Sequence, residues 1–115
     1  MKLCIGMTVE EATRLFSIDD ITNVQDMKNG YYWIRGWYTL FEERTYVELC
    51  FKDGLLWMVS LSPHLNIEKE RPPFSIDMAD YRYCQQWVSK HKEQLPEGTE
   101  AYYEPRTPSV GIVIR

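Results

Sequence analysis

The side chains that could do chemistry are few, and none of them falls into a catalytic pattern. The three cysteines, Cys4, Cys50 and Cys84, form neither a C-x-x-C pair nor a zinc-binding set. Of the two histidines, His64 follows a Ser-Pro pair and His91 lies on the apolar stripe of a predicted helix. A cysteine and a histidine together could act as nucleophile and base, but free cysteines are more often packed than reactive. We expect buried free thiols and a structural role for His91.

Carboxylates gather around one predicted hairpin, where Glu42, Glu43 and Glu48 occur close together. Paired carboxylates can hydrolyse glycosidic bonds or ligate a metal, but the run Glu42-Glu43-Arg44 is typical of a charged turn. The six glycines are dispersed and form no phosphate-binding loop. The sequence therefore predicts no catalytic residues, no metal and no cofactor, and we expect that the chain is not an enzyme.

One aromatic segment points to recognition instead of catalysis. Residues 31–40 read YYWIRGWYTL, a composition typical of a β-strand. Large apolar side chains occupy both faces of this strand, although a sheet with helices on one face should alternate apolar and polar residues. Either a helix covers the second face as well, or part of that face contacts a partner.

The second interpretation makes the aromatic residues of this strand the binding candidates, because tryptophan and tyrosine dominate interface energetics. Trp33 and Trp37 share one face and Tyr32 and Tyr38 the other, and strand pairing alone does not say which face is exposed. Arg35 and nearby Glu48 could form a charged pair at the rim of such a surface.

The charge balance bears on the class of partner. The net charge is −4, which argues against a nucleic-acid partner. Residues 1–27 contain five acidic and two basic residues and so carry −3 of it, with Asp19, Asp20 and Asp26 closest to the aromatic strand in the chain. This segment is either a solvated acidic face or a surface that steers the protein towards a basic partner.

The elements that must position these side chains begin with a short helix. Thr8 and Glu11 form a capping-box pattern, and an apolar face follows it at Val9, Ala12, Leu15 and Phe16. Residues 17–29 are ambiguous between a second helix, a strand and a loop, and we favour an irregular acidic loop with a short strand.

Two further strands follow the aromatic one, at 45–51 and 55–61. A three-residue loop, Lys52-Asp53-Gly54, would pair Phe51 with Leu55 and unite the apolar faces, with Gly54 at positive φ. Residues 62–74 are predicted to be a loop, and a second helix is predicted from Asp77 or Met78 to Gln94, with Trp87 in the core. Strands at 99–104 and 109–114 complete the chain.

These elements predict one α+β domain covering residues 1–115. A single antiparallel sheet of four to five strands would carry two helices on one face, in the order α-(β)-β-β-β-α-β-β. No apolar stretch is long enough to span a membrane, no signal peptide is evident, and the odd number of cysteines favours a reducing compartment. We therefore expect a cytoplasmic protein with no membrane partner.

The opening Gly6-Met7-Thr8-x-x-Glu11 helix and the hairpin run Leu49-Cys50-Phe51-Lys52-Asp53-Gly54-Leu55-Leu56 have counterparts in known proteins. Over residues 5–61 the chain resembles small bacterial proteins of the β-lactamase-inhibitor-protein-like type and toxin-immunity proteins of similar size. The resemblance implies a bacterial binding protein and carries over no functional residue.

Three classes of function are open at this point. The favoured hypothesis is a stoichiometric inhibitor, a cytoplasmic immunity protein that binds a bacterial toxin, with a basic toxin domain as one candidate partner. A small-molecule-binding domain that uses the aromatic strand as a pocket wall is the alternative, and a structural or adaptor subunit is the third. A homodimer is compatible with any of them.

Overall fold

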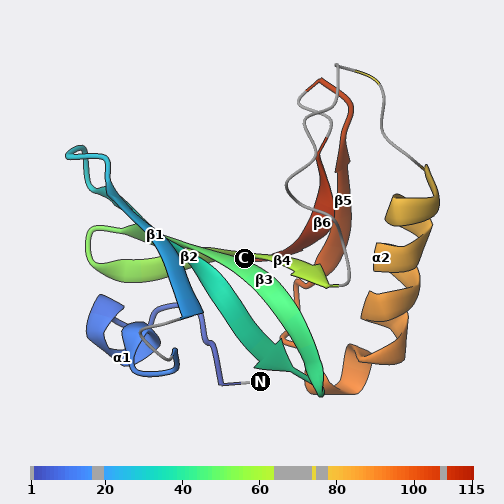
Figure 1. Cartoon of the computed structure of the whole chain (residues 1–115), viewed down its shortest axis with the longest axis horizontal. Coiled ribbons are helices and arrows are strands. Elements are labelled where there is room, and N and C mark those ends of the chain that lie inside the picture. The colour runs from blue at the N-terminus through green and yellow to red at the C-terminus, as the bar shows by residue number, and fades with distance from the viewer. Residues whose placement is uncertain (1, 17–19, 64–73, 75–77, 107–108) are drawn as a thin grey trace.

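Six antiparallel strands form one sheet in the order β1-β2-β3-β4-β6-β5 (Figure 1). The computed structural model describes residues 2–16, 20–63, 74, 78–106 and 109–115. The strands are β1 (Ile21–Asp26), β2 (Tyr31–Leu40), β3 (Glu43–Lys52), β4 (Leu55–Pro63), β5 (Glu100–Glu104) and β6 (Ser109–Ile114). The helices are α1 (Val9–Thr13), α2 (Met78–Lys90) and the short 3-10 helix η2 (Lys92–Gln94).

The α+β class and the single antiparallel sheet are confirmed, but the expected strand number was too low. β1 is a strand of six residues that pairs with β2, so the short strand expected within the irregular loop at residues 17–29 is present. Its first half is irregular, since the register with β2 shifts between Ile21 and Asn23. β4 also runs two residues further than expected, to Pro63. The predicted loop beyond it lies mostly outside the described residues.

The β3–β4 hairpin corrects the predicted register. Lys52 pairs with Leu55, so the loop has two residues, and the expected pairing of Phe51 with Leu55 is wrong. Asp53 and Gly54 both have positive φ, 51° and 86°, as a type I′ turn requires. Positive φ at Gly54 is confirmed, but it belongs to a different turn from the one expected.

A β-bulge in β4 places the apolar residues of β3 and β4 on the same face of the sheet, as the longer loop was expected to do. The register shifts between Cys50 and Phe51, which leaves Trp57 as the extra residue in β4. Beyond it Leu49 pairs with Val59, and the core faces of the two strands coincide. The extra residue itself points away from the core, and Trp57 is 48% exposed.

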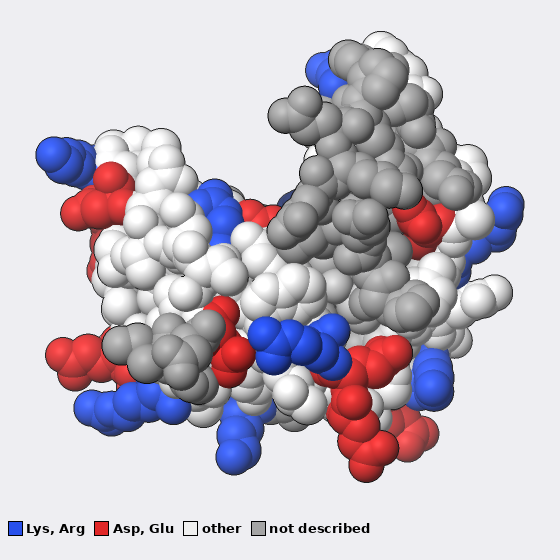
Figure 2. All heavy atoms as spheres, in the orientation of Figure 1, with Lys and Arg blue, Asp and Glu red and all other residues white. Residues whose placement is uncertain are grey.

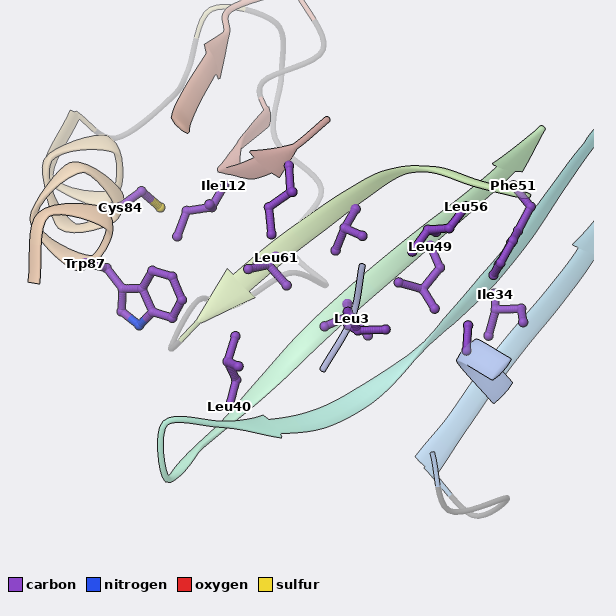
Figure 3. Packing of buried hydrophobic residues seen from close by; sticks show 14 residues of the cluster. Leu3, Ile34, Leu40, Leu49, Phe51, Leu56, Leu61, Cys84, Trp87 and Ile112 are labelled. Atoms are coloured by element: carbon purple, nitrogen blue, oxygen red, sulfur yellow. The ribbon is translucent and has the colours of Figure 1, made fainter. Parts of the chain in front are cut away.

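The core lies on one face of the sheet, beneath both helices. Figure 3 shows Cys84 and Trp87 of α2 directed at Leu61 and Ile112 of the sheet, with Leu3 between this group and a second group around Ile34. Ala12 of α1 is buried in the same cluster. The capping box of α1 is confirmed, since the Thr8 hydroxyl accepts from the backbone N–H of Glu11 and the Glu11 carboxylate accepts from that of Thr8. Burial of Trp87, 4% exposed, is confirmed as well.

The tip of the β2–β3 hairpin holds the end of α2. Phe41 and Glu42 form this tip, and both have positive φ, 51° and 67°. The Phe41 ring stacks on His91 at 4.4 Å and tilts against Trp87 at 5.7 Å, while the Trp87 indole N–H donates to Glu43 at 3.0 Å. The helix ends at Lys90, earlier than expected, because His91 leaves the helical conformation where it meets this tip.

The strained tip gives a first test. Glu42 is exposed, so Glu42→Gly should relieve the left-handed strain without losing a packed side chain, and we expect the free energy of unfolding to rise by about 1 kcal/mol in urea denaturation. Glu100→Gly, at an exposed strand position, should instead lower it. A Glu42→Gly protein no more stable than the parent would contradict the turn geometry.

The second test concerns the joint between α2 and the sheet. We expect Trp87→Ala to lower the free energy of unfolding by about 3–5 kcal/mol, because a large buried ring and its hydrogen bond are lost together. Tyr81→Ala, on the same helix but partly exposed, is the control and should cost much less. Equal melting temperatures for the two variants would show that the helix packs differently.

Candidate binding surface

The face of the sheet opposite the core carries most of the side chains that could bind a partner, and we call it the open face. In β1 to β4 its residues alternate with the core residues, because successive side chains of a strand point to opposite faces. They are Asn23, Gln25, Tyr31, Trp33, Arg35, Trp37, Thr39, Arg44, Tyr46, Glu48, Cys50, Lys52, Leu55, Met58, Ser60 and Ser62, together with the bulge residue Trp57, whose ring packs against Tyr31 at 6.2 Å.

Both described α-helices pack on the other side of the sheet, so the open face is covered by neither of them (Figure 1). β5 and β6 stand out of the plane of β1–β4, and β6 pairs with only the Val59–Leu61 part of β4. The open face is therefore bent rather than flat. Figure 2 shows Lys, Arg, Asp and Glu side chains distributed over the visible part of the surface.

The structure separates the four aromatic candidates of β2. Trp33 and Trp37 lie on the open face and are partly exposed. Tyr32 and Tyr38 lie on the core face, where Tyr32 meets Phe51 at 6.2 Å and Tyr38 meets Phe16 of the N-terminal helical region at 5.6 Å. Partial burial there raises the pKa of Tyr38. Only the tryptophans of this set are placed to meet a partner on the open face.

Arg35 sits at the centre of the open face, and four neighbours fix its side chain. Its Nε donates to Glu48 at 2.8 Å, and one terminal nitrogen donates to Asn23 at 2.9 Å and to Gln25 at 3.2 Å. The guanidinium also lies over the Trp33 ring, 4.9 Å from its centre. The pair with Glu48 that the sequence suggested is present, but it lies in the middle of the face rather than at a rim. A charge-assisted pair with this many supports holds both side chains in place.

The other rings of β2 on this face also carry cations. Arg44 lies over Trp37 at 5.2 Å and Lys52 over Tyr31 at 5.9 Å, while Tyr46 packs edge-on against Trp37 at 5.4 Å. Each ring is thus covered in part by a charged side chain from its own sheet. This arrangement explains how a strand that is apolar on both faces can have one face turned away from the core.

The acidic candidates do not gather into one patch. Asp20 precedes β1 and lies 3.4 Å from Arg44, whereas Asp26 ends β1 and accepts the backbone N–H of Lys28 at 2.8 Å in the turn. The two residues are six positions apart along the chain, which is about 20 Å in a strand. Asp19 lies outside the described residues. The sequence alone could not show that Asp20 is ion-paired and that Asp26 closes a turn.

A pocket that sequence reasoning missed adjoins the open face at β4, β5 and β6. Its volume is about 410 Å³, and Met58, Ser60, Tyr102 and Val113 line it together with Arg115. Burial raises the pKa of Tyr102, and the negative charge of Glu48 raises it further. The sequence could have indicated that Tyr102 points away from the core, because side chains alternate along β5 and Ala101 faces the core. It could not have indicated that Tyr102 lies near β3, because that depends on the bend of the sheet.

The thiols and carboxylates of the described residues are of types that can ligate a metal. No group of three His, Cys, Asp or Glu side chains there could ligate a metal. Cys50 and Cys84 are buried free thiols as expected, but Cys4 is exposed, which corrects that part of the prediction. Burial raises the pKa of both Cys50 and Cys84, the latter to about 11, so neither favours the thiolate. His64 lies outside the described residues. No helix within them is long and apolar enough to cross a membrane.

The raised pKa of Cys84 predicts a pH dependence. An unfolded thiol titrates near 9.0 and the folded one near 11, so between these values the unfolded chain releases a proton that the folded chain keeps. We expect the free energy of unfolding to fall as pH rises through this window, and to fall less steeply in Cys84→Ala. Cys4→Ala, which removes the exposed thiol, should keep the parent slope. If the free energy of unfolding depends on pH in the same way in the parent and in Cys84→Ala, the raised pKa of Cys84 is refuted.

No protein-family model matches the sequence, and neither curated proteins nor solved structures give a significant match to it.

Proposed function

We propose that this chain is a stoichiometric protein-binding domain that inhibits its partner, and that it acts as a cytoplasmic immunity protein against a bacterial toxin. The single observation that carries the proposal is the open face, where Trp33 and Trp37 flank an Arg35 side chain held by Glu48 and three other neighbours. Tryptophan, tyrosine and arginine are the residue types enriched among interface hot spots.

The rigidity of this surface supports a binding role. Arg35 is only 23% exposed and its partner Glu48 34%, and the hydrogen bonds of Arg35 to Glu48, Asn23 and Gln25 restrict its side chain. Ordering side chains on association costs free energy, so a surface that is ordered beforehand retains more of its contact energy as affinity. A rigid scaffold with a fixed aromatic surface suits an inhibitor that must stay bound.

The size, the charge and the resemblance of the chain support an immunity role in particular. The chain is small and its net charge is −4, and residues 5–61 resemble small bacterial inhibitor and immunity proteins. An acidic inhibitor associates faster with a basic toxin domain because opposite fields steer the encounter.

The pocket beside the open face supports the second candidate, a small-molecule-binding domain. Its volume of about 410 Å³ is within the range of ligand sites, and Tyr102 and Ser60 supply hydroxyl groups to it. A ligand in this pocket would contact β4–β6 and leave Trp33 and Trp37 uncovered. Variants of the two tryptophans therefore separate the two functions.

The proposal is tested by co-expression with the product of the adjacent reading frame. We expect a one-to-one complex on size exclusion, and we expect Trp33→Ala with Trp37→Ala to weaken it by roughly a thousandfold, about 2 kcal/mol for each hot spot. Both rings lie outside the core cluster, so the double variant should keep its circular dichroism spectrum and cooperative unfolding.

Tyr81→Ala is the matched control, because it removes an aromatic ring from α2, on the other side of the sheet. It should leave the complex intact. Absence of any complex with the adjacent product would overturn the immunity assignment. A complex that tolerates loss of both tryptophans but not of Tyr81 would overturn the open face as its contact surface.

A further inference from the structure

Three cations lie in a row along the open face. They belong to Lys52 and Arg44, eight residues apart on β3, and to Arg35 on β2, which pairs with Glu48. Their charged groups lie over three rings of β2 at intervals of two and four residues, so the row extends over roughly 20 Å. Each cation lies over an aromatic ring of β2: Tyr31, Trp33 and Trp37.

The two outer cations, Lys52 and Arg44, have N–H groups that can donate hydrogen bonds to a partner. Lys52 is exposed and has no carboxylate partner among the described residues. The Arg44 side chain is 61% exposed, and among the described residues its one carboxylate partner is Asp20, at 3.4 Å. On the open face of β1–β4 these cations and Arg35 face a single carboxylate, Glu48, with Asp20 adding a second at the edge. The row is thus locally positive in a chain whose net charge is −4.

We propose that the partner contributes an acidic segment that lies along β2 and β3, with carboxylates at Arg44 and Lys52 and apolar side chains against the parts of Trp33 and Trp37 that the arginines leave exposed. This inference rests on the proposed protein-binding function and names the chemistry of the partner's contact. The face already accepts carboxylates at two of its three cations, since Glu48 binds Arg35 and Asp20 lies against Arg44. Guanidinium groups held over rings are well oriented for this kind of pairing.

A single-stranded RNA would also seek aromatic rings and cations on a sheet, but this arrangement suits it poorly. Bases stack flat on open aromatic faces, whereas Arg35 and Arg44 lie over the faces of Trp33 and Trp37. The net charge of −4 opposes binding of a polyanion that makes many phosphate contacts. A short acidic protein segment carries few charges, so contacts with the three cations of the row are sufficient to bind it.

A basic toxin domain and an acidic contact segment are compatible, because they act at different distances. The total charge of each protein governs the encounter, whereas the side chains at the contact govern the docked complex. Asp20 and Asp26, the acidic residues at the ends of β1, are separated along the strand and engaged within the chain, so they offer a basic segment no continuous contact.

The test uses two synthetic twelve-residue peptides of one sequence, with glutamate or with lysine at every fourth position. Each is titrated into the isotopically labelled protein, and the four tryptophan indole N–H resonances are followed by NMR. We expect the glutamate peptide to shift the resonances of Trp33 and Trp37 in a saturable manner. Trp87, whose indole is bound to Glu43 in the core, is the internal reference and should not move.

Charge variants supply the matched comparison. Arg44→Gln with Lys52→Gln should weaken the glutamate peptide roughly tenfold, while Lys90→Gln with Lys92→Gln, which changes the net charge equally at the end of α2, should not. The inference is overturned if the glutamate peptide moves neither resonance, if the lysine peptide or an oligouridylate moves them at lower concentration, or if both variants weaken binding equally. If it fails while the complex still depends on Trp33 and Trp37, only the acidic contact is lost and the proposed function stands.

Discussion

A sheet of six strands has two faces to protect from water, and the described helices of this chain protect only one. α1, α2 and the segment around Leu3 all pack on the face that carries Ile34, Leu49, Leu61 and Ile112. Since burial of apolar area on that face is the main source of stability, everything that holds the helices there is structurally important. The open face has to be stabilised by its own side chains.

The hairpins show how this one-sided core constrains the backbone. Phe41 and Glu42 hold a left-handed turn that neither prefers, and the stacking of Phe41 on His91 and Trp87 offsets its cost. In β4 the bulge at Trp57 moves one bulky ring outward so that Val59 and Leu61 can face the core. On the open face, Arg35, Arg44 and Lys52 cover rings that would otherwise be exposed. The same contacts restrict the side chains of the surface that we propose as the binding site.

Patterns that depend on neighbouring residues could be predicted from the sequence. The Thr8–Glu11 capping box and the buried Trp87 are confirmed because helix capping and helical periodicity are local. The register at Gly54 was wrong because a two-residue turn followed by a bulge at Trp57 unites the same apolar faces as a three-residue loop, and residue pattern does not distinguish the two. β1 was ambiguous because it is an edge strand with little buried surface, so its sequence carries almost no alternation.

The candidate surface could be predicted only where it depends on patterns among neighbouring residues. The excess of apolar residues on β2 and the Arg35–Glu48 pair could be predicted from the sequence. Whether the odd- or even-numbered residues of β2 are exposed could not, because that depends on which face of the sheet the helices cover. The contribution of Tyr102 required the bend between β4 and β6, which no local pattern encodes.

The most direct measurement of whether the open face is the contact surface is site-specific photo-crosslinking in the complex with the product of the adjacent reading frame. A photo-reactive phenylalanine analogue at Tyr46 lies on the open face beside Trp37, and one at Tyr81 lies on α2. The account predicts a crosslink to the partner from position 46 and none from position 81. A crosslink from position 81 with none from position 46 would contradict it.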